Sequence, residues 1–138
     1  MKVLKYLLAI LISGLIISCI KDNRNSKYKV VYNKNTDTIS KLKNDSITLF
    51  FETNFKDDLL KIEINGSKKE YYLNTDMSTG YADYIELGKL TDFKSLMFSI
   101  NKGSNVSVKD VKSNFIYINY KRDSVVWVDF SNMSKSYK

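Results

Sequence analysis

Apolar and aromatic residues alternate with polar ones along most of this chain. In 47–53, for example, Ile47, Leu49 and Phe51 would share one face of a strand. A period of two places successive side chains on opposite sides of an extended backbone, whereas an amphipathic helix needs a period of 3.6 residues. The pattern therefore predicts a β-rich fold, with a helical stripe indicated for no more than one turn near 90–94.

Turn residues separate these alternating segments at intervals of roughly ten residues. Asn65-Gly66 tolerates the positive φ angles of a tight hairpin turn, and 121–124 separates a second pair of strands. Short strands with this spacing are typical of an antiparallel sandwich or a small barrel. We expect an all-β, antiparallel two-sheet β-sandwich of about seven or eight strands, immunoglobulin-like or transthyretin-like. The predicted strands are 28–32, 47–53, 59–64, 70–74, 81–87, 96–100, 115–120 and 125–130.

The N-terminus is organised differently. Lys2 and Lys5 precede an apolar run over 6–17, which leads into Ile16-Ile17-Ser18-Cys19. A positive start, an apolar run and small residues before a cut are typical of a secretory signal, and the run is short of the roughly 20 apolar residues of a membrane span. The segment resembles the lipobox of bacterial lipoproteins, with a branched apolar residue three positions before the cysteine and a small one just before it.

This resemblance implies that Cys19 receives diacylglycerol, that a signal peptidase cleaves before it and that the new amine is acylated. Two or three acyl chains hold a protein on a bilayer firmly. We therefore expect a signal peptide with a helical core over 1–18, a lipidated tether over 19–27 and one β-sandwich domain over 28–138. The resemblance also implies an outer-membrane location, because Ile20 rather than aspartate follows the cysteine. The periplasmic and surface faces of that membrane are not distinguished.

Composition narrows the chemistry available to the domain. The chain has no histidine and a single cysteine, Cys19, so disulfides are excluded and zinc would lack nearly all of its usual ligands. The net charge of +7 arises from lysines scattered among acids rather than gathered in a stripe. A solvated surface with mild attraction to acidic partners explains this balance. We expect no nucleic-acid partner, no metal and no cofactor.

Two acidic segments, Asp57-Asp58 and 76–80, could contribute to a calcium site, which needs six to eight oxygen ligands. Neither has the alternating oxygens of a calcium loop, and aspartates that cap turns explain both. Ser40-Lys41-Leu42-Lys43 matches the Ser-x-x-Lys pattern of penicillin-recognising enzymes, but the chain lacks their further motifs and their size. The sequence thus predicts a protein that is not an enzyme.

Three short segments share a pattern that could be modified. Asp37-Thr38-Ile39, Asp45-Ser46-Ile47 and Asp123-Ser124-Val125 resemble the Asp-(Ser/Thr)-aliphatic acceptor of envelope O-glycosylation in Bacteroidetes. The resemblance implies glycans on Thr38, Ser46 and Ser124. Asp-Ser before an aliphatic strand is also an ordinary way for a chain to leave a turn, so both interpretations stay open here.

Aromatic residues are abundant, and Tyr71-Tyr72, Tyr81 and Tyr84 adjoin one another or the turns. Tyrosine suits protein and sugar contacts because it offers rigid area with a polar tip, although alternate tyrosines can simply cover a sheet. Trp127 is expected in the core. We expect a lipid-anchored envelope protein that binds a protein partner or serves as an accessory module. The alternative is an immunity or inhibitor lipoprotein that neutralises a toxin or hydrolase in the periplasm.

Overall fold

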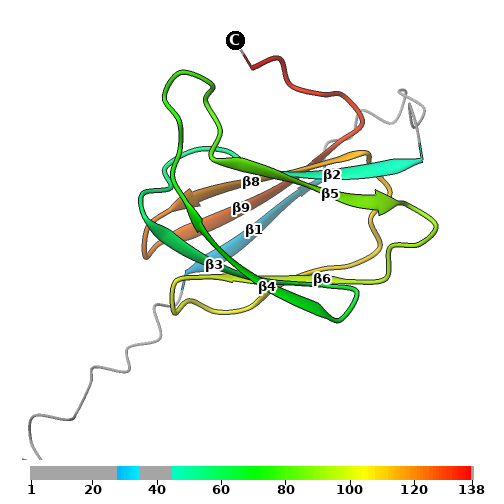
Figure 1. Ribbon diagram of the computed structural model, residues 1–138, viewed down its shortest axis with the longest axis horizontal. Coiled ribbons are helices and arrows are strands. Elements are labelled where there is room, and N and C mark those ends of the chain that lie inside the picture. The colour runs from blue at the N-terminus through cyan, green and yellow to red at the C-terminus, as the bar shows by residue number, and fades with distance from the viewer. Residues whose placement is uncertain (1–27, 35–44, 138) are drawn as a thin grey trace, which may run out of the picture.

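The computed structural model describes residues 28–34 and 45–137, which form nine β-strands and no helix. The strands make two sheets that lie one above the other, with β2, β5 and β8 in the upper layer of Figure 1 and β3, β4 and β6 in the lower. The prediction of an all-β fold with two sheets is confirmed. Sheet A contains β1 (Lys29–Lys34), β2 (Ser46–Phe51), β5 (Asp83–Lys89), β8 (Phe115–Lys121) and β9 (Val125–Ser131). Sheet B contains β3 (Asp58–Ile64), β4 (Ser67–Leu73), β6 (Leu96–Ile100) and β7 (Val106–Val108).

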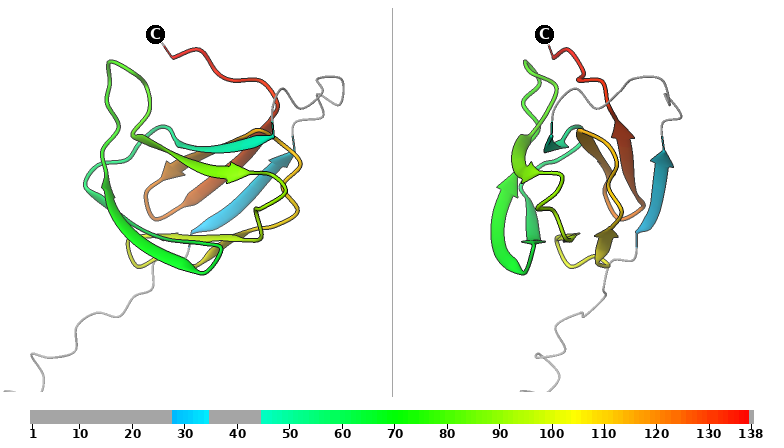
Figure 2. Two further views of the ribbon diagram at one scale, coloured as in Figure 1. Left: turned by 45° about the vertical axis from the view of Figure 1, so that its right-hand side comes forward. Right: turned by 90° about the vertical axis from the view of Figure 1, so that its right-hand side faces the viewer.

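Strand pairing corrects one part of the prediction. The order in sheet A is β1-β9-β8-β2-β5 and that in sheet B is β4-β3-β6-β7. Two neighbouring pairs, β1 with β9 and β2 with β8, run parallel, so the expectation of a purely antiparallel sandwich is wrong. Parallel strands need a crossover connection, and between β2 and β8 the chain passes through sheet B (Figure 2). Side chains alternate in the same way in parallel and antiparallel strands, so the sequence pattern could not reveal the parallel pairs.

The predicted strands agree with the observed ones to within a few residues, and the 96–100 strand coincides with β6. Both expected hairpins are present. The β3–β4 turn uses positive φ at Asn65 (49°) and Gly66 (87°), and the β8–β9 turn does so at Asp123 (54°). The ninth strand, β7, was not predicted, because three residues are too few to show an alternation.

The hydrophobic core fills the space between the sheets. From β2, Ile47, Leu49 and Phe51 point into it and are essentially inaccessible to solvent, as the period-two pattern predicted. The inward side chains of β3, β6 and β7 meet them from sheet B. The outer face of each sheet is therefore the surface available for binding. The two outer faces differ sharply in the kinds of side chain that they carry.

Candidate functional site

Aromatic residues line up across three strands on the outer face of sheet A. Phe50 on β2 lies opposite Tyr84 on β5 and opposite Tyr117 on β8. The rings of Phe50 and Tyr117 stack with centroids 5.4 Å apart, and those of Phe50 and Tyr84 with centroids 5.8 Å apart. We call Tyr117, Phe50 and Tyr84 the aromatic row.

Trp127 lies on the same outer face and not in the core, so that expectation was wrong. Its neighbours on β9, Val126 and Val128, are fully buried, and alternation turns the half-buried Trp127 the other way. Its register partner on β8 is Asn119. Because β9 carries apolar residues on both faces, the sequence could not indicate which face points inward. The outer face of sheet A is therefore aromatic over β5, β2, β8 and β9.

The C-terminal residues 132–137 run across this face (Figure 1). The Tyr137 ring lies 4.8 Å from that of Tyr81 and 5.6 Å from that of Phe50, centroid to centroid. The Lys135 ammonium lies 4.2 Å from the centroid of the Tyr117 ring. We call 132–137 the C-terminal strap.

Glu52 holds the strap in place. This side chain follows β2 on the outer side and is only 5% exposed. Its carboxylate oxygens accept hydrogen bonds from Lys135 Nζ (2.8 and 2.7 Å), the Tyr137 hydroxyl (2.8 Å) and Asn119 Nδ2 (2.6 Å). Burial raises the pKa of Tyr137, and the Glu52 carboxylate acts in the same direction by favouring the neutral phenol. The carboxylate is thus fully partnered although it is nearly buried.

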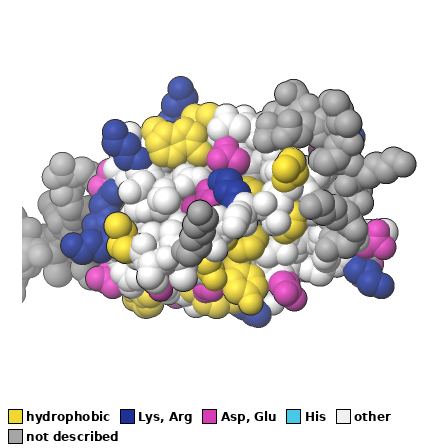
Figure 3. Space-filling model, turned by 90° about the horizontal axis from the view of Figure 1, so that it is seen from above, with side chains coloured by type: hydrophobic (Ala, Val, Ile, Leu, Met, Phe, Trp, Pro, Cys, Tyr) yellow, Lys and Arg dark blue, Asp and Glu magenta, His cyan; other side chains and the backbone are white. Residues whose placement is uncertain are grey.

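A pocket of about 420 Å³ opens beside the strap at the β5 end of the aromatic row. Phe50, Tyr81, Tyr84 and Tyr137 supply its ring surfaces, and Thr48, Thr79 and Glu86 supply its polar groups. In the space-filling view of Figure 3, which looks onto the molecule from above Figure 1, hydrophobic side chains form patches between charged ones. A shallow pocket with rings and few polar groups is typical of a recognition site.

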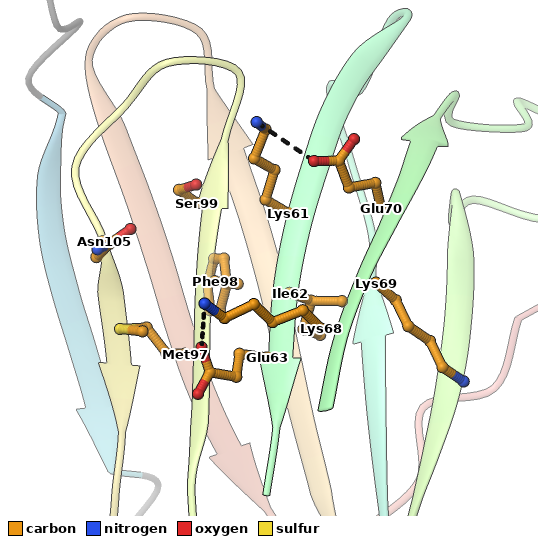
Figure 4. A pocket seen from close by; sticks show the side chains of 10 residues that line it. All are labelled: Lys61, Ile62, Glu63, Lys68, Lys69, Glu70, Met97, Phe98, Ser99 and Asn105. Carbon is orange, nitrogen blue, oxygen red and sulfur yellow. Dashed lines mark ion pairs between the residues drawn. The ribbon is translucent and has the colours of Figure 1, made fainter. Parts of the chain in front are cut away.

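The outer face of sheet B is polar by contrast. A hollow of about 350 Å³ lies there among charged side chains of β3 and β4 (Figure 4). Lys61 pairs with Glu70 (3.3 Å) and Lys68 pairs with Glu63 (3.7 Å) across these two strands. Tyr72 stands on this face with 74% of its surface exposed. Exposed ion pairs of this kind contribute little to stability, so this face has the character of a solvated surface.

The acidic segments singled out in the sequence have structural roles. Asp58 is fully buried and accepts hydrogen bonds from Arg122 and from Asn101 Nδ2, each at 2.7 Å. Asp76 Oδ1 accepts bonds from the Ser78 hydroxyl and amide, and these bonds lower the pKa of Asp76. Within 28–34 and 45–137 no three His, Cys, Asp or Glu side chains gather where they could hold a metal ion, and no helix is long and apolar enough to cross a membrane.

The residues predicted to be modified are not brought together. Ser46 is the exposed first residue of β2, and Ser124 is exposed in the β8–β9 turn. Because β2 and β8 run parallel, these two serines lie at opposite ends of sheet A. Thr38 and the lipidation residue Cys19 lie outside the described residues. Glycosylation and lipidation stay predictions.

Sequence reasoning found Tyr81 and Tyr84 but missed the residues that complete the site. Nothing marked Glu52 and Lys135 as partners, since 83 positions separate them. One usable signal was present: Phe50-Phe51-Glu52 and Tyr84-Ile85-Glu86 share the pattern aromatic-x-Glu at outward positions.

Comparison of this chain with protein-family models, with curated proteins and with solved structures finds no match.

Proposed function

We propose that this chain is a small lipid-anchored protein of the bacterial outer membrane that binds a protein partner and performs no catalysis. The anchor rests on the resemblance of the segment ending at Cys19 to a lipobox. Acyl chains on that residue would hold the domain at the membrane, with the tether 19–27 between the two.

The single observation that carries the binding role is the aromatic outer face of sheet A. Tyr84 is 50% exposed, and Trp127 and Phe50 are half-buried on the solvent side of the sheet. Exposed apolar patches larger than a few side chains mark interaction sites, and tyrosine and tryptophan are enriched among the residues that dominate binding energy. The outer face of sheet B carries mainly charged side chains, with Tyr72 and Met97 exposed among them.

Within the two-sheet class, we propose an immunoglobulin-like plan rather than a transthyretin-like one. A variable-type immunoglobulin sandwich divides nine strands into a sheet of five and a sheet of four, and the nine described strands divide in the same way. The parallel β2–β8 pair is a departure from that plan.

The test is affinity capture of the lipidated full-length protein from gently solubilised membranes, read by mass spectrometry. Tyr84→Ala and Trp127→Ala should each reduce capture of the partner, because both remove ring surface from the outer face of sheet A. Tyr72→Ala is the matched control, since it removes an exposed tyrosine from sheet B. Equal capture by all three variants would contradict a binding role for this face.

The identity of the captured proteins separates the two versions of the proposal. Several envelope components would favour an accessory module. A single stoichiometric toxin or hydrolase would favour an immunity or inhibitor lipoprotein, which also needs an anchor and an exposed binding face but no catalytic groups.

A further inference from the structure

The pocket at the β5 end of the aromatic row points to the chemistry of the partner. It combines ring surfaces from Phe50, Tyr81, Tyr84 and Tyr137 with the carboxylate of Glu86. An inference about the ligand of this pocket rests on the proposed binding role of the face. It adds to that role the chemical group that the pocket recognises.

The pocket contains one of two copies of the same arrangement. Phe50 and Glu52 lie two residues apart at the end of β2, and Tyr84 and Glu86 lie two residues apart on β5. A spacing of two places each glutamate on the same face as its aromatic neighbour. Because β2 and β5 are antiparallel and Phe50 pairs with Tyr84, the two carboxylates flank the aromatic row at opposite ends of these strands.

The copy at Glu52 holds an ammonium group. Lys135 Nζ lies 2.7 Å from Glu52 Oε2 and 4.2 Å from the centroid of the Tyr117 ring. A lysine ammonium is attracted both by the face of an aromatic ring and by a neighbouring carboxylate. This face of the protein therefore already binds one lysine side chain, which is its own.

The arrangement at Glu86 has a carboxylate and an aromatic ring at the same spacing, without a bound cation. Within the described residues the Glu86 carboxylate makes no ion pair and no hydrogen bond, and no lysine or arginine is among the residues that line the pocket. Although the whole chain carries a net charge of +7, the pocket itself is locally negative. At physiological ionic strength, charges about 8 Å away are already screened, so the local charge governs what enters.

We propose that this pocket binds a lysine side chain presented by the partner protein, as the Glu52 site binds Lys135. The ammonium pairs with Glu86, and the alkyl stem of the lysine lies against the rings of Tyr84 and Tyr81. A neutral sugar can stack on the same rings and donate hydroxyl hydrogen bonds to Glu86, but it brings no positive charge, so glucose serves as the competing probe.

Saturation-transfer difference NMR on the lipidated full-length protein tests this proposal. The protein is kept in a polyoxyethylene detergent, since a maltoside would itself present a sugar. The probes are Nα-acetyl-lysine amide, its uncharged analogue Nα-acetyl-norleucine amide, and glucose. We expect transfer to the ε-methylene protons of the lysine probe and little transfer to the other two.

Four variants locate the binding. Glu86→Gln and Tyr84→Leu should each weaken binding of the lysine probe roughly 2- to 5-fold, the range expected for one exposed cation–π or charge contact. Tyr84→Phe should bind as the parent does, because the ring and not the hydroxyl makes the contact. Glu70→Gln, the same change on sheet B, should have no effect.

Three results would overturn the proposal: equal transfer to the norleucine probe, binding of glucose but not of lysine, or an unchanged lysine affinity in Glu86→Gln. Each of these leaves the capture experiment with Trp127→Ala unaffected. Failure of the lysine proposal and failure of the binding role are therefore distinguishable.

Discussion

At the scale of single residues, Tyr28 is buried in the core at the start of the described part of the chain. Its hydroxyl accepts a hydrogen bond from the Ile100 amide (3.1 Å) and donates to the carbonyl of Ser104. Burial raises the pKa of this phenol. The ring lies against Gly103, where an added β-carbon would overlap Tyr28 Cε1.

Gly103→Ala should therefore destabilise the domain by about 1–3 kcal/mol, the cost of forcing an extra methyl group into a packed site. The measurement is chemical denaturation followed by Trp127 fluorescence. Ser104→Ala is the control, because only the backbone carbonyl of Ser104 is used and the change should stay within about 0.5 kcal/mol. Equal stability of both variants would show that the Tyr28 ring moves aside freely.

Asp58 ties the two sheets together. It lies at the start of β3, fully buried, and its carboxylate pairs with Arg122, which comes from the β8–β9 turn of sheet A. Arg122 also donates to the carbonyl of Lys56 (2.6 Å). A nearly planar guanidinium can serve several acceptors at once, so one side chain links both layers.

Asp58→Ala should lower the free energy of unfolding by about 2–4 kcal/mol, because it leaves the donors of Arg122 and Asn101 without their acceptor. Arg122→Ala should be comparably destabilising, because it leaves the fully buried Asp58 carboxylate without its counter-charge, although Asn101 still donates to it. Urea denaturation of the two variants measures the loss in the free energy of unfolding for each. A loss below about 0.5 kcal/mol in Asp58→Ala, the level of an ordinary surface substitution, would contradict this role.

At the scale of elements, the C-terminal strap behaves as an additional layer on sheet A. The Tyr117 hydroxyl donates to the carbonyl of Met133 (3.1 Å) and accepts from the Lys135 amide (3.0 Å). Together with the contacts to Glu52, these bonds hold a segment that pairs with none of the nine described strands. The strap also forms one wall of the pocket through Tyr137.

Tyr137→Phe should cost about 1–2 kcal/mol at neutral pH, because a hydrogen bond to the Glu52 carboxylate is lost. The pKa of Tyr137 is raised in the folded state, so the stability that this phenol contributes is complete below the unfolded value of about 10 and is lost as pH rises through the folded pKa. The difference between parent and variant should therefore narrow above pH ~10. Guanidinium denaturation of parent and variant at neutral and alkaline pH measures this difference in stability.

Tyr72→Phe is the matched control for the strap, since Tyr72 is 74% exposed and belongs to sheet B. This variant should match the parent at neutral pH. A difference between Tyr137→Phe and the parent that stays constant or widens at alkaline pH would contradict the proposed contact with Glu52.

At the scale of the whole molecule, the lipobox-like N-terminus predicts the cellular location of the protein. Cys19→Ala should move the protein from the membrane fraction to the soluble fraction, because no acyl chain could then be attached. Fractionation with an antibody to the domain, together with mass measurement of the parent, checks this. Ser18→Ala keeps a small residue before the cysteine and is the control. Membrane retention of an unlipidated Cys19→Ala protein would overturn the anchor.

Much of the fold could be predicted from local sequence, because local patterns encode local structure. Alternation in 47–53 and 59–64 predicted two strands and the residues that share a face of each, and Asn65-Gly66 predicted a hairpin. Both depend on neighbours within a few positions. Of the tyrosines singled out in the sequence, Tyr84 lines the pocket on sheet A, whereas Tyr72 lies on the outer face of sheet B.

Only the tertiary structure decided how these pieces combine. The parallel pairing of β1 with β9, the outward side of Trp127 and the union of Glu52 with Lys135 all join residues far apart in the chain. An alternating pattern shows which residues of a strand share a face. Which of the two faces points into the core depends on the side chains of the opposite sheet. By itself, the sequence determined the strands, their turns and a lipobox-like start. The aromatic face, and the lysine that it holds, came from the packing of the whole chain.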